Sequence, residues 1–311
     1  MRAEYNSTIH AYESTNIELL NIIADEFDVA TEAEGEPVEL NASNAVKDTV
    51  SSEEKSKVKS TLLIQKVAQR VKDLIKKIGE IFNGLKLKIQ NRLRTLMETD
   101  KGFYKLYYKR KSMIKPYKNV SVISYKYNNA AIEQPLNKVF SEILMCLDKL
   151  RAVEGTSNTN ERISTILESG TGNIIETLLE PYVKDSDIPV KTIPDFIKYL
   201  VQKFRGEKKE LVYSDTQLGA IEANALSTKS ISDMCNKYLK DAQGAYDKIR
   251  ALEYQISRTS SDDKVISLIS ANAAKASVLY NAYSALVSAY YELKVEESLN
   301  YRIILKRFYQ F

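Results

Sequence analysis

The sequence has little glycine, proline and cysteine, no tryptophan and a single histidine. Ten Gly and six Pro among 311 residues are few for a sandwich or barrel, which needs turn residues every few positions. The two cysteines, Cys146 and Cys235, lie far apart and outside any C-x-x-C pattern, which indicates neither a disulfide framework nor a zinc site. We expect both to be buried as small apolar side chains. With 44% hydrophobic and 28% charged residues, a mainly α-helical protein is predicted.

Long apolar runs and catalytic motifs are also missing. No stretch approaches the ~18 consecutive apolar residues of a membrane span, and the N-terminus lacks the plan of a secretory signal. The only histidine is His10, and there is no Gly-x-Ser-x-Gly elbow, H-E-x-x-H motif or dense carboxylate cluster. The pairs Asp262-Asp263 and Glu296-Glu297 are interpreted as helix-end and surface charges. We therefore expect no enzyme, no cofactor and no metal, in a protein made in a cytoplasm.

Charge is divided unevenly along the chain. The formal net charge is +4, but residues 1–40 carry one base and ten acids, and residues 55–118 carry nineteen bases and four acids. Residues 119–311 balance at 24 charges of each sign. This division predicts an acidic head, a basic arm and a neutral body, with the head and the arm meeting different partners.

Apolar spacing and composition predict five segments. Residues 1–30 are expected to form an acidic helical head, and residues 31–50 a linker rich in acids and small residues. Residues 51–118 are the basic amphipathic arm, predicted as one long helix or two in near-register. Residues 119–210 are a helical body with a short strand, and residues 211–311 a long helical hairpin.

The body and the hairpin have the clearest local patterns. Over residues 119–127, Val120 and Val122 alternate with Ser121, Ile123 and Tyr125, and the enrichment in β-branched and aromatic residues predicts one short strand or extended connector. Helical spacing predicts a helix over 130–153 and a short one over 195–205. In the hairpin, one helix is expected over 214–258 and a second, rich in Ala and Tyr, over 263–309. Two long helices joined by a five-residue turn are predicted to pack antiparallel, in the manner of a coiled coil.

The basic arm combines an apolar stripe with a cationic face. Its apolar residues recur at three- and four-residue steps from Val58 to Leu96, a spacing typical of a helix packed against a core. Ordinary surface helices gain from intermixed acids, so the excess of bases indicates a polyanion that relieves their repulsion. DNA phosphate and an anionic membrane both fit. The candidate nucleic-acid contacts are Lys72, Lys76, Lys77, Arg92, Arg94, Lys109, Arg110 and Lys111.

Aromatic residues interleave with bases at the end of the arm. They are Phe103, Tyr104, Tyr107, Tyr108 and Tyr117. Such rings can stack on unpaired nucleobases, anchor at a lipid interface or pack in a core. No motif of a sequence-specific nucleic-acid fold is present, so contact with DNA is expected to be insensitive to sequence. The run 301–309 is predicted to be a second, weaker basic patch.

The segment Ala30-Thr31-Glu32-Ala33-Glu34-Gly35 resembles the small-x-Glu sites at which prohead proteases of large tailed phages trim scaffold, capsid and internal head proteins. The acidic opening around Tyr12-Glu13 is similar in style to the delivery segments of that family. The stretch from Lys118 to Tyr127 resembles the mid-chain junction of virion internal proteins from phages of Gram-positive bacteria. The resemblance implies cleavage within the residues Glu32, Ala33, Glu34 and Gly35.

The same resemblance implies a function and a location. It implies a virion structural protein, packaged inside the capsid after assembly in the host cytoplasm and bound non-specifically to packaged double-stranded DNA. The prohead core, capsid proteins and the prohead protease are its other implied partners. Two alternatives stay open: a membrane-active or ejected virion protein whose region 58–97 inserts at an anionic lipid interface, and a cellular helical scaffold or adaptor protein.

Overall fold

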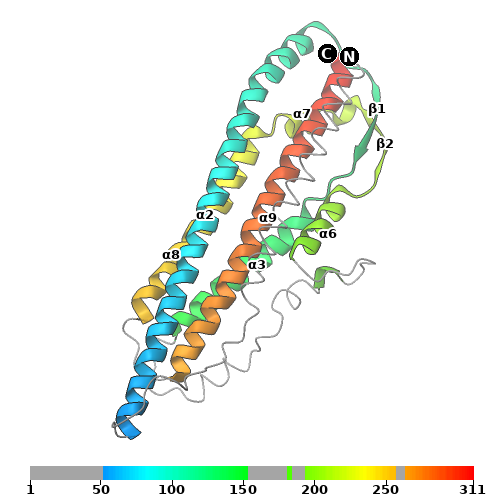
Figure 1. Ribbon diagram of the computed structural model, residues 1–311. Coiled ribbons are helices and arrows are strands. Elements are labelled where there is room, and N and C mark those ends of the chain that lie inside the picture. Colours follow the sequence, from blue (N-terminus) through cyan, green and yellow to red (C-terminus); the bar gives the residue numbers. More distant parts are fainter. Residues whose placement is uncertain (1–51, 153–180, 184–192, 257–262) are drawn as a thin grey trace. The chain divides into compact units, whose positions relative to one another are not determined.

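The computed structural model describes residues 52–152, 181–183, 193–256 and 263–311 (Figure 1). Within this part of the chain the fold is mainly α-helical, with one two-stranded antiparallel sheet, as the sequence predicts. The acidic head and the linker, with the four predicted cleavage residues, lie outside the described residues.

Helix α2, Ser52–Met113, is one continuous helix of 62 residues. Of the two alternatives left open by the sequence, the single long helix is therefore confirmed. The helix passes through Gly84, where a Cβ would meet open space, and through Gly79, where a Cβ would lie 2.8 Å from the hydroxyl oxygen of Tyr246. Gly79 thus permits the close approach of a tyrosine that a larger residue would displace.

The sheet joins two strands that are far apart in the sequence. Strand β1, Asn119–Tyr125, pairs antiparallel with β2, Lys208–Ser214, so that Asn119 lies opposite Ser214 and Tyr125 opposite Lys208. The sequence predicts β1 but not β2. The second strand opens with Lys-Lys-Glu, which lacks the β-branched enrichment of a strand, and its hydrogen-bonding partner is not local.

The described part of the body also contains two shorter helices, α3 and α6. Helix α3 spans Ala130–Ala152, close to the predicted range. Helix α6 spans Ile193–Arg205 and ends at Gly206, whose φ of +61° is the left-handed conformation common after a helix C-terminus. The Gly206 N–H donates to the carbonyl oxygen of Gln202 at 2.8 Å, which satisfies one of the last free carbonyls of the helix.

The single helix predicted over 214–258 was wrong. After a 3₁₀ turn, the chain forms α7, Leu218–Ala225, and α8, Thr228–Ile256, separated by a break of two residues. The Ala225 carbonyl oxygen at this break accepts hydrogen bonds from Nε of Arg302 at 3.0 Å and Oγ of Ser298 at 3.4 Å. These tertiary contacts explain why local helical spacing did not predict the interruption.

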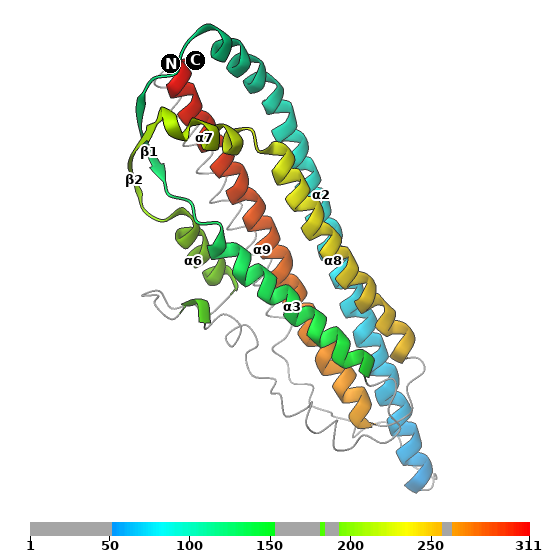
Figure 2. The ribbon, with the colours of Figure 1, turned by 180° about the vertical axis from the view of Figure 1, so that it is seen from behind.

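The antiparallel C-terminal hairpin is confirmed. Helix α9, Asp263–Tyr309, runs in the direction opposite to α8 (Figure 2). The Tyr283 hydroxyl donates to the Tyr238 carbonyl oxygen at 3.4 Å, and the rings of Tyr238 and Tyr290 meet edge to face with centroids 6.2 Å apart. Every residue of α9 from 282 to 291 is buried, so this part of the helix is packed on all sides.

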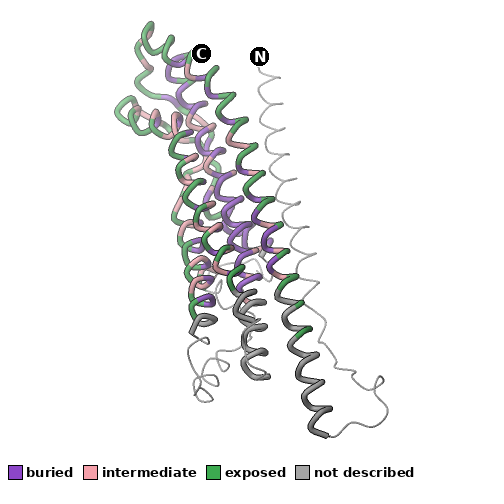
Figure 3. Tube along the Cα trace, turned by 90° about the vertical axis from the view of Figure 1, so that its left-hand side faces the viewer, coloured by how far each residue is buried: buried purple, intermediate pink, exposed green. Residues whose placement is uncertain are grey.

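The chain divides into two compact units, and the long helices contribute to both. The candidate site described below lies wholly in the second unit, whose ranges are 81–139, 179–243 and 282–311. In this unit a cluster of buried side chains joins the end of α2 to α7, β1 and the end of α9; it contains Phe103, Tyr107, Val120, Ile221, Ala225, Ile304, Leu305, Phe308 and Tyr309. In the described part of α2, buried residues recur at helical spacing between exposed ones, and those from Ile78 to Leu96 follow the predicted stripe (Figure 3).

Candidate polyanion-binding surface

The C-terminal end of α2 and the connector after it carry an uninterrupted positive charge. Seven bases and no acid lie between Lys101 and Lys118, and all seven are exposed. Lys101, Lys105 and Lys109 are four residues apart, so they share one face of the helix at intervals of about 6 Å along its axis. Like charges at this spacing repel one another. The nearest acids on the helix, Glu98 and Asp100, precede Lys101 and pair with Arg94 and Arg302.

One of the seven bases is held by the fold. The Lys111 Nζ lies 2.7 Å from Oε1 of Glu222 on α7 and 5.6 Å from the centre of the Tyr107 ring. The hydrogen bond to Glu222 raises the pKa of Lys111. The other six form no ion pair with a residue that the structure describes. We name them the basic end surface: Lys101, Lys105, Lys109, Arg110, Lys115 and Lys118.

The end of α9 extends this positive region. The Tyr117 N–H donates to the Phe308 carbonyl oxygen at 3.1 Å, which fixes the connector against the last turn of α9. Lys306 and Arg307 in that turn are both exposed. Cations in the last turn of a helix interact favourably with its dipole, which gives these residues a structural role as well. Their charges still face solvent beside the connector.

The structure separates the five aromatic residues of the arm into two groups. Phe103 and Tyr107 are buried and stacked, with ring centroids 6.0 Å apart, and Tyr104 is half-buried with its hydroxyl 3.3 Å from that of Thr228. Burial, together with a hydrogen bond donated to Glu222, raises the pKa of Tyr107 far above its ordinary value. Tyr108 and Tyr117 remain 57% and 51% exposed.

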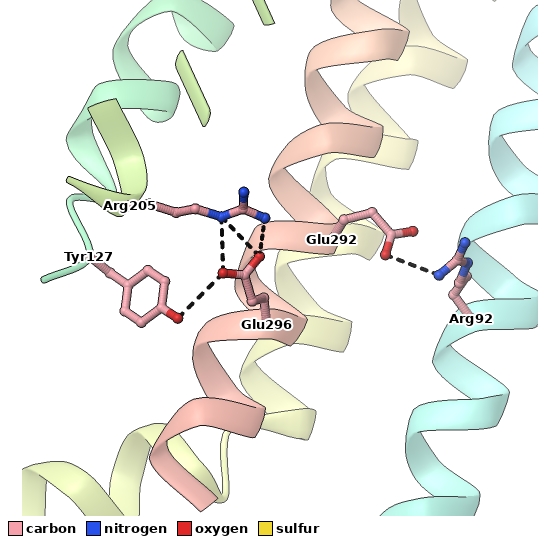
Figure 4. A network of polar contacts seen from close by, with 5 residues as sticks. All are labelled: Arg92, Tyr127, Arg205, Glu292 and Glu296. Atoms are coloured by element: carbon pink, nitrogen blue, oxygen red, sulfur yellow. Dashed lines mark hydrogen bonds and ion pairs between the residues drawn. The ribbon is translucent and has the colours of Figure 1, made fainter. Parts of the chain in front are cut away.

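The predicted contacts in the middle of α2 are not all available to a ligand. Arg94 is exposed but lies 3.3 Å from Glu98, one turn along the helix. Arg92 faces inward, where its Nη1 lies 3.1 Å from Oε2 of Glu292 on α9 (Figure 4). Arg92 therefore balances a carboxylate whose side chain is only 11% exposed.

The remaining three predicted contacts belong to the first unit. Lys72 and Lys76 are exposed and Lys77 is half-buried. Lys76 lies 4.0 Å from Glu80 in a weak surface pair. Of the eight predicted contacts, Lys109, Arg110 and Lys111 thus lie together at the end of α2, and only the first two of these are unpaired among the described residues. Lys101, Lys105, Lys115 and Lys118 share this exposed end of the arm and were not among the predicted contacts, although the absence of acids between 101 and 118 is visible in the sequence.

Glu296 and Glu297 are not surface charges, which corrects the sequence interpretation. Arg205 of α6 donates to Glu296 through Nε at 3.0 Å, and the Tyr127 hydroxyl lies at 3.5 Å from the same carboxylate (Figure 4). Glu297 is 5% exposed and pairs with Lys294 one turn before it. Burial raises the pKa of Tyr127 strongly. Cations from α6 and α9 itself allow these acids to be buried.

A second buried pair lies beneath the basic end surface. Arg302, predicted as part of a basic patch, is 4% exposed and forms an ion pair with Asp100 of α2. Its guanidinium lies over the ring of Phe103 at 5.1 Å and donates to the Ala225 carbonyl oxygen. The Thr228 hydroxyl donates to the second oxygen of Asp100. Asp100 and Arg302 thus join α2, α7, α8 and α9, and neither takes part in the surface above them.

Other kinds of site find no support in the described residues. No cluster of three or more His, Cys, Asp or Glu side chains there could hold a metal, and no helix there has the length and hydropathy to cross a bilayer. Cys146 and Cys235 are buried, as predicted, and form no disulfide; burial raises the pKa of Cys235 to about 12. Comparisons of the chain with protein-family models, curated proteins and solved structures gave no match.

Proposed function

We propose that this protein is an internal structural protein of a tailed-phage virion and binds packaged double-stranded DNA without sequence specificity through the basic end surface. The supporting observation is the set of six exposed bases that form no ion pair with the described residues. Binding of such a surface to phosphates releases condensed counterions, which drives non-specific association. Exposed lysines that repel one another along α2 also gain from an anionic partner.

The location in the virion head rests on the N-terminal sequence. Cleavage after Glu32 removes seven acids and one base, so the net charge of the protein rises by six. A trimmed protein would then carry its basic end surface without the acidic head. N-terminal peptide mapping of protein recovered from its native particle tests this part: a terminus at Ala33 or Gly35 supports it, and an intact Met1 or Arg2 contradicts it.

DNA binding is tested with matched triple variants. K105Q/K109Q/R110Q neutralises the centre of the basic end surface, and K198Q/K229Q/K240Q neutralises three exposed lysines on α6 and α8. Each phosphate contact contributes about 0.9 to the slope of log affinity against log salt, so the first variant should reduce the slope by up to about 3 between about 50 and 200 mM salt. Wild type that fails to bind duplex DNA at low salt, or equal losses in both variants, would refute the proposal.

A membrane surface is the second candidate. Leu106 and Met113, 55% and 65% exposed, are seven residues apart and therefore share a face of α2, with Lys105, Lys109 and Arg110 around them. Apolar side chains flanked by bases can lie at the interface of an anionic bilayer. Sedimentation with phosphatidylserine vesicles tests this candidate: binding that L106A/M113A abolishes supports it, and the absence of binding excludes it.

A further inference from the structure

We infer that the basic end surface binds single-stranded nucleic acid, with Tyr108 and Tyr117 stacked on unpaired bases. The inference rests on the proposed function, since it uses the same cations. In a duplex the faces of the bases are covered by their neighbours, so exposed aromatic rings have little to stack on. In a single strand each base offers an open face, and proteins bind such strands by combining a positive surface with aromatic platforms.

The distribution of exposed aromatic rings carries the inference. Among the residues that the structure describes, Tyr108 and Tyr117 are the only exposed aromatic side chains. Both lie in the stretch 101–118, which contains seven bases and no acid. Packing accounts for the other three rings of the arm and leaves these two unexplained. In the described part of the chain, aromatic rings are thus exposed only where bases are concentrated.

Tyr108 is placed as a platform. Its ring centroid lies 5.3 Å from that of Tyr107, which is fully buried and hydrogen-bonded to Glu222. Lys101 and Lys105 precede Tyr108 by seven and three residues, so they share its side of α2. A base stacked on the exposed face of Tyr108 would therefore have cations near its phosphate.

Tyr117 is held by the backbone. Its N–H donates to the Phe308 carbonyl oxygen at 3.1 Å, and the carbonyl oxygen of the next residue, Lys118, accepts from the Asp215 N–H at 2.9 Å. The ring is exposed between Lys115 and Lys118 on a connector bonded on both sides of it. A fixed backbone reduces the entropy lost when a ligand binds.

The test compares two nucleic acids and two variants of the full chain. Fluorescence anisotropy measures binding of a labelled 20-nucleotide thymidine strand and of a 20-base-pair duplex at low salt. Y108L/Y117L should weaken binding of the single strand by at least about 5-fold for each ring and that of the duplex by less than about 2-fold. L87A/M97A, which changes two exposed apolar residues of α2 outside this stretch, should leave both unchanged. Circular dichroism confirms that each variant is folded.

Each outcome separates the inference from the proposed function. Equal losses for the two ligands, no loss for the single strand, or a comparable loss in L87A/M97A would overturn stacking while leaving DNA binding intact. Wild type that binds neither nucleic acid would overturn both. Photocrosslinking of a strand containing 5-iodouracil gives an independent readout: crosslinked peptides should contain Tyr108 or Tyr117, and crosslinks confined to other residues would contradict the inference.

Discussion

The buried ion pair between Asp100 and Arg302 should dominate the stability of its unit. The two side chains are 6% and 5% exposed. Asp100 Oδ1 meets the guanidinium as an ion pair without the alignment of a hydrogen bond, while Thr228 donates to Oδ2. The substitution Asp100→Asn keeps the shape of the side chain but leaves the Arg302 charge without a counterion. Breaking a buried pair in this way costs about 3–5 kcal/mol.

The reverse change and the double change complete a mutant cycle. Arg302→Met retains much of the apolar stem that lies over Phe103, but leaves the Asp100 carboxylate without a cation and with only neutral hydroxyl partners, Thr228 and Tyr104. If the charges act mainly on each other, D100N/R302M should be less destabilised than the sum of the single variants by at least about 2 kcal/mol. The free energy of unfolding is measured by urea denaturation, followed by circular dichroism.

The exposed pair Arg94–Glu98 on the same helix is the control. Its side chains are 83% and 66% exposed, and such pairs contribute about 0–1 kcal/mol. R94Q should therefore shift the free energy of unfolding by less than about 0.5 kcal/mol. Single changes at Asp100 and Arg302 that cost no more than R94Q, or that add without coupling, would refute the assignment of this pair as a buried structural element.

Two further predictions concern helix ends and pH. Gln310 has a φ of +51° and Gly206 a φ of +61°, a conformation that costs a non-glycine residue about 1 kcal/mol. In denaturant unfolding, Gln310→Gly should therefore raise the free energy of unfolding of the protein, and Gly206→Ala should lower it, by amounts of that order. Burial raises the pKa of Glu292, so the folded state keeps this proton to a higher pH than the unfolded chain, and stability is lost as pH rises from the ordinary pKa to the raised one. Glu292→Gln, which leaves the partly exposed Arg92 hydrated, should be more stable than wild type at pH 7 but not near pH 4; a difference that is constant with pH would contradict this reasoning.

Sequence periodicity predicted those parts of the fold that depend on local spacing. The apolar stripe of α2, the β-branched residues of β1 and the Ala- and Tyr-rich helical spacing of α9 are all local signals, so their elements were found. Strand β2 and the break between α7 and α8 depend on distant partners, β1 and Arg302. Local spacing carries no information about such contacts.

The burial of charged residues in the core also depends on distant partners, so local spacing did not predict it. Glu296, Glu297 and Arg302 lie on a helix that is packed on several sides, where an alternation of polar and apolar positions no longer marks solvent. Their counterions come from α2, α6 and α9 itself. Periodicity alone therefore did not indicate that these charges were buried. A helix rich in Ala and Tyr, with only scattered charges, is better interpreted as a central helix than as a surface helix.

Position on α2 decides what each cation of the arm can do. Arg92 follows the buried Ile89 by three residues and precedes the buried Leu96 by four, so helical spacing places it on the packed stripe, where it pairs with Glu292. Lys105 follows Phe103 by two residues, about 200° around the helix, and is therefore directed to solvent. The apolar stripe in the sequence thus distinguishes the bases of the arm that face the core from those that face solvent. A base in register with the stripe stabilises the fold, and a base opposite to it is available to a polyanion.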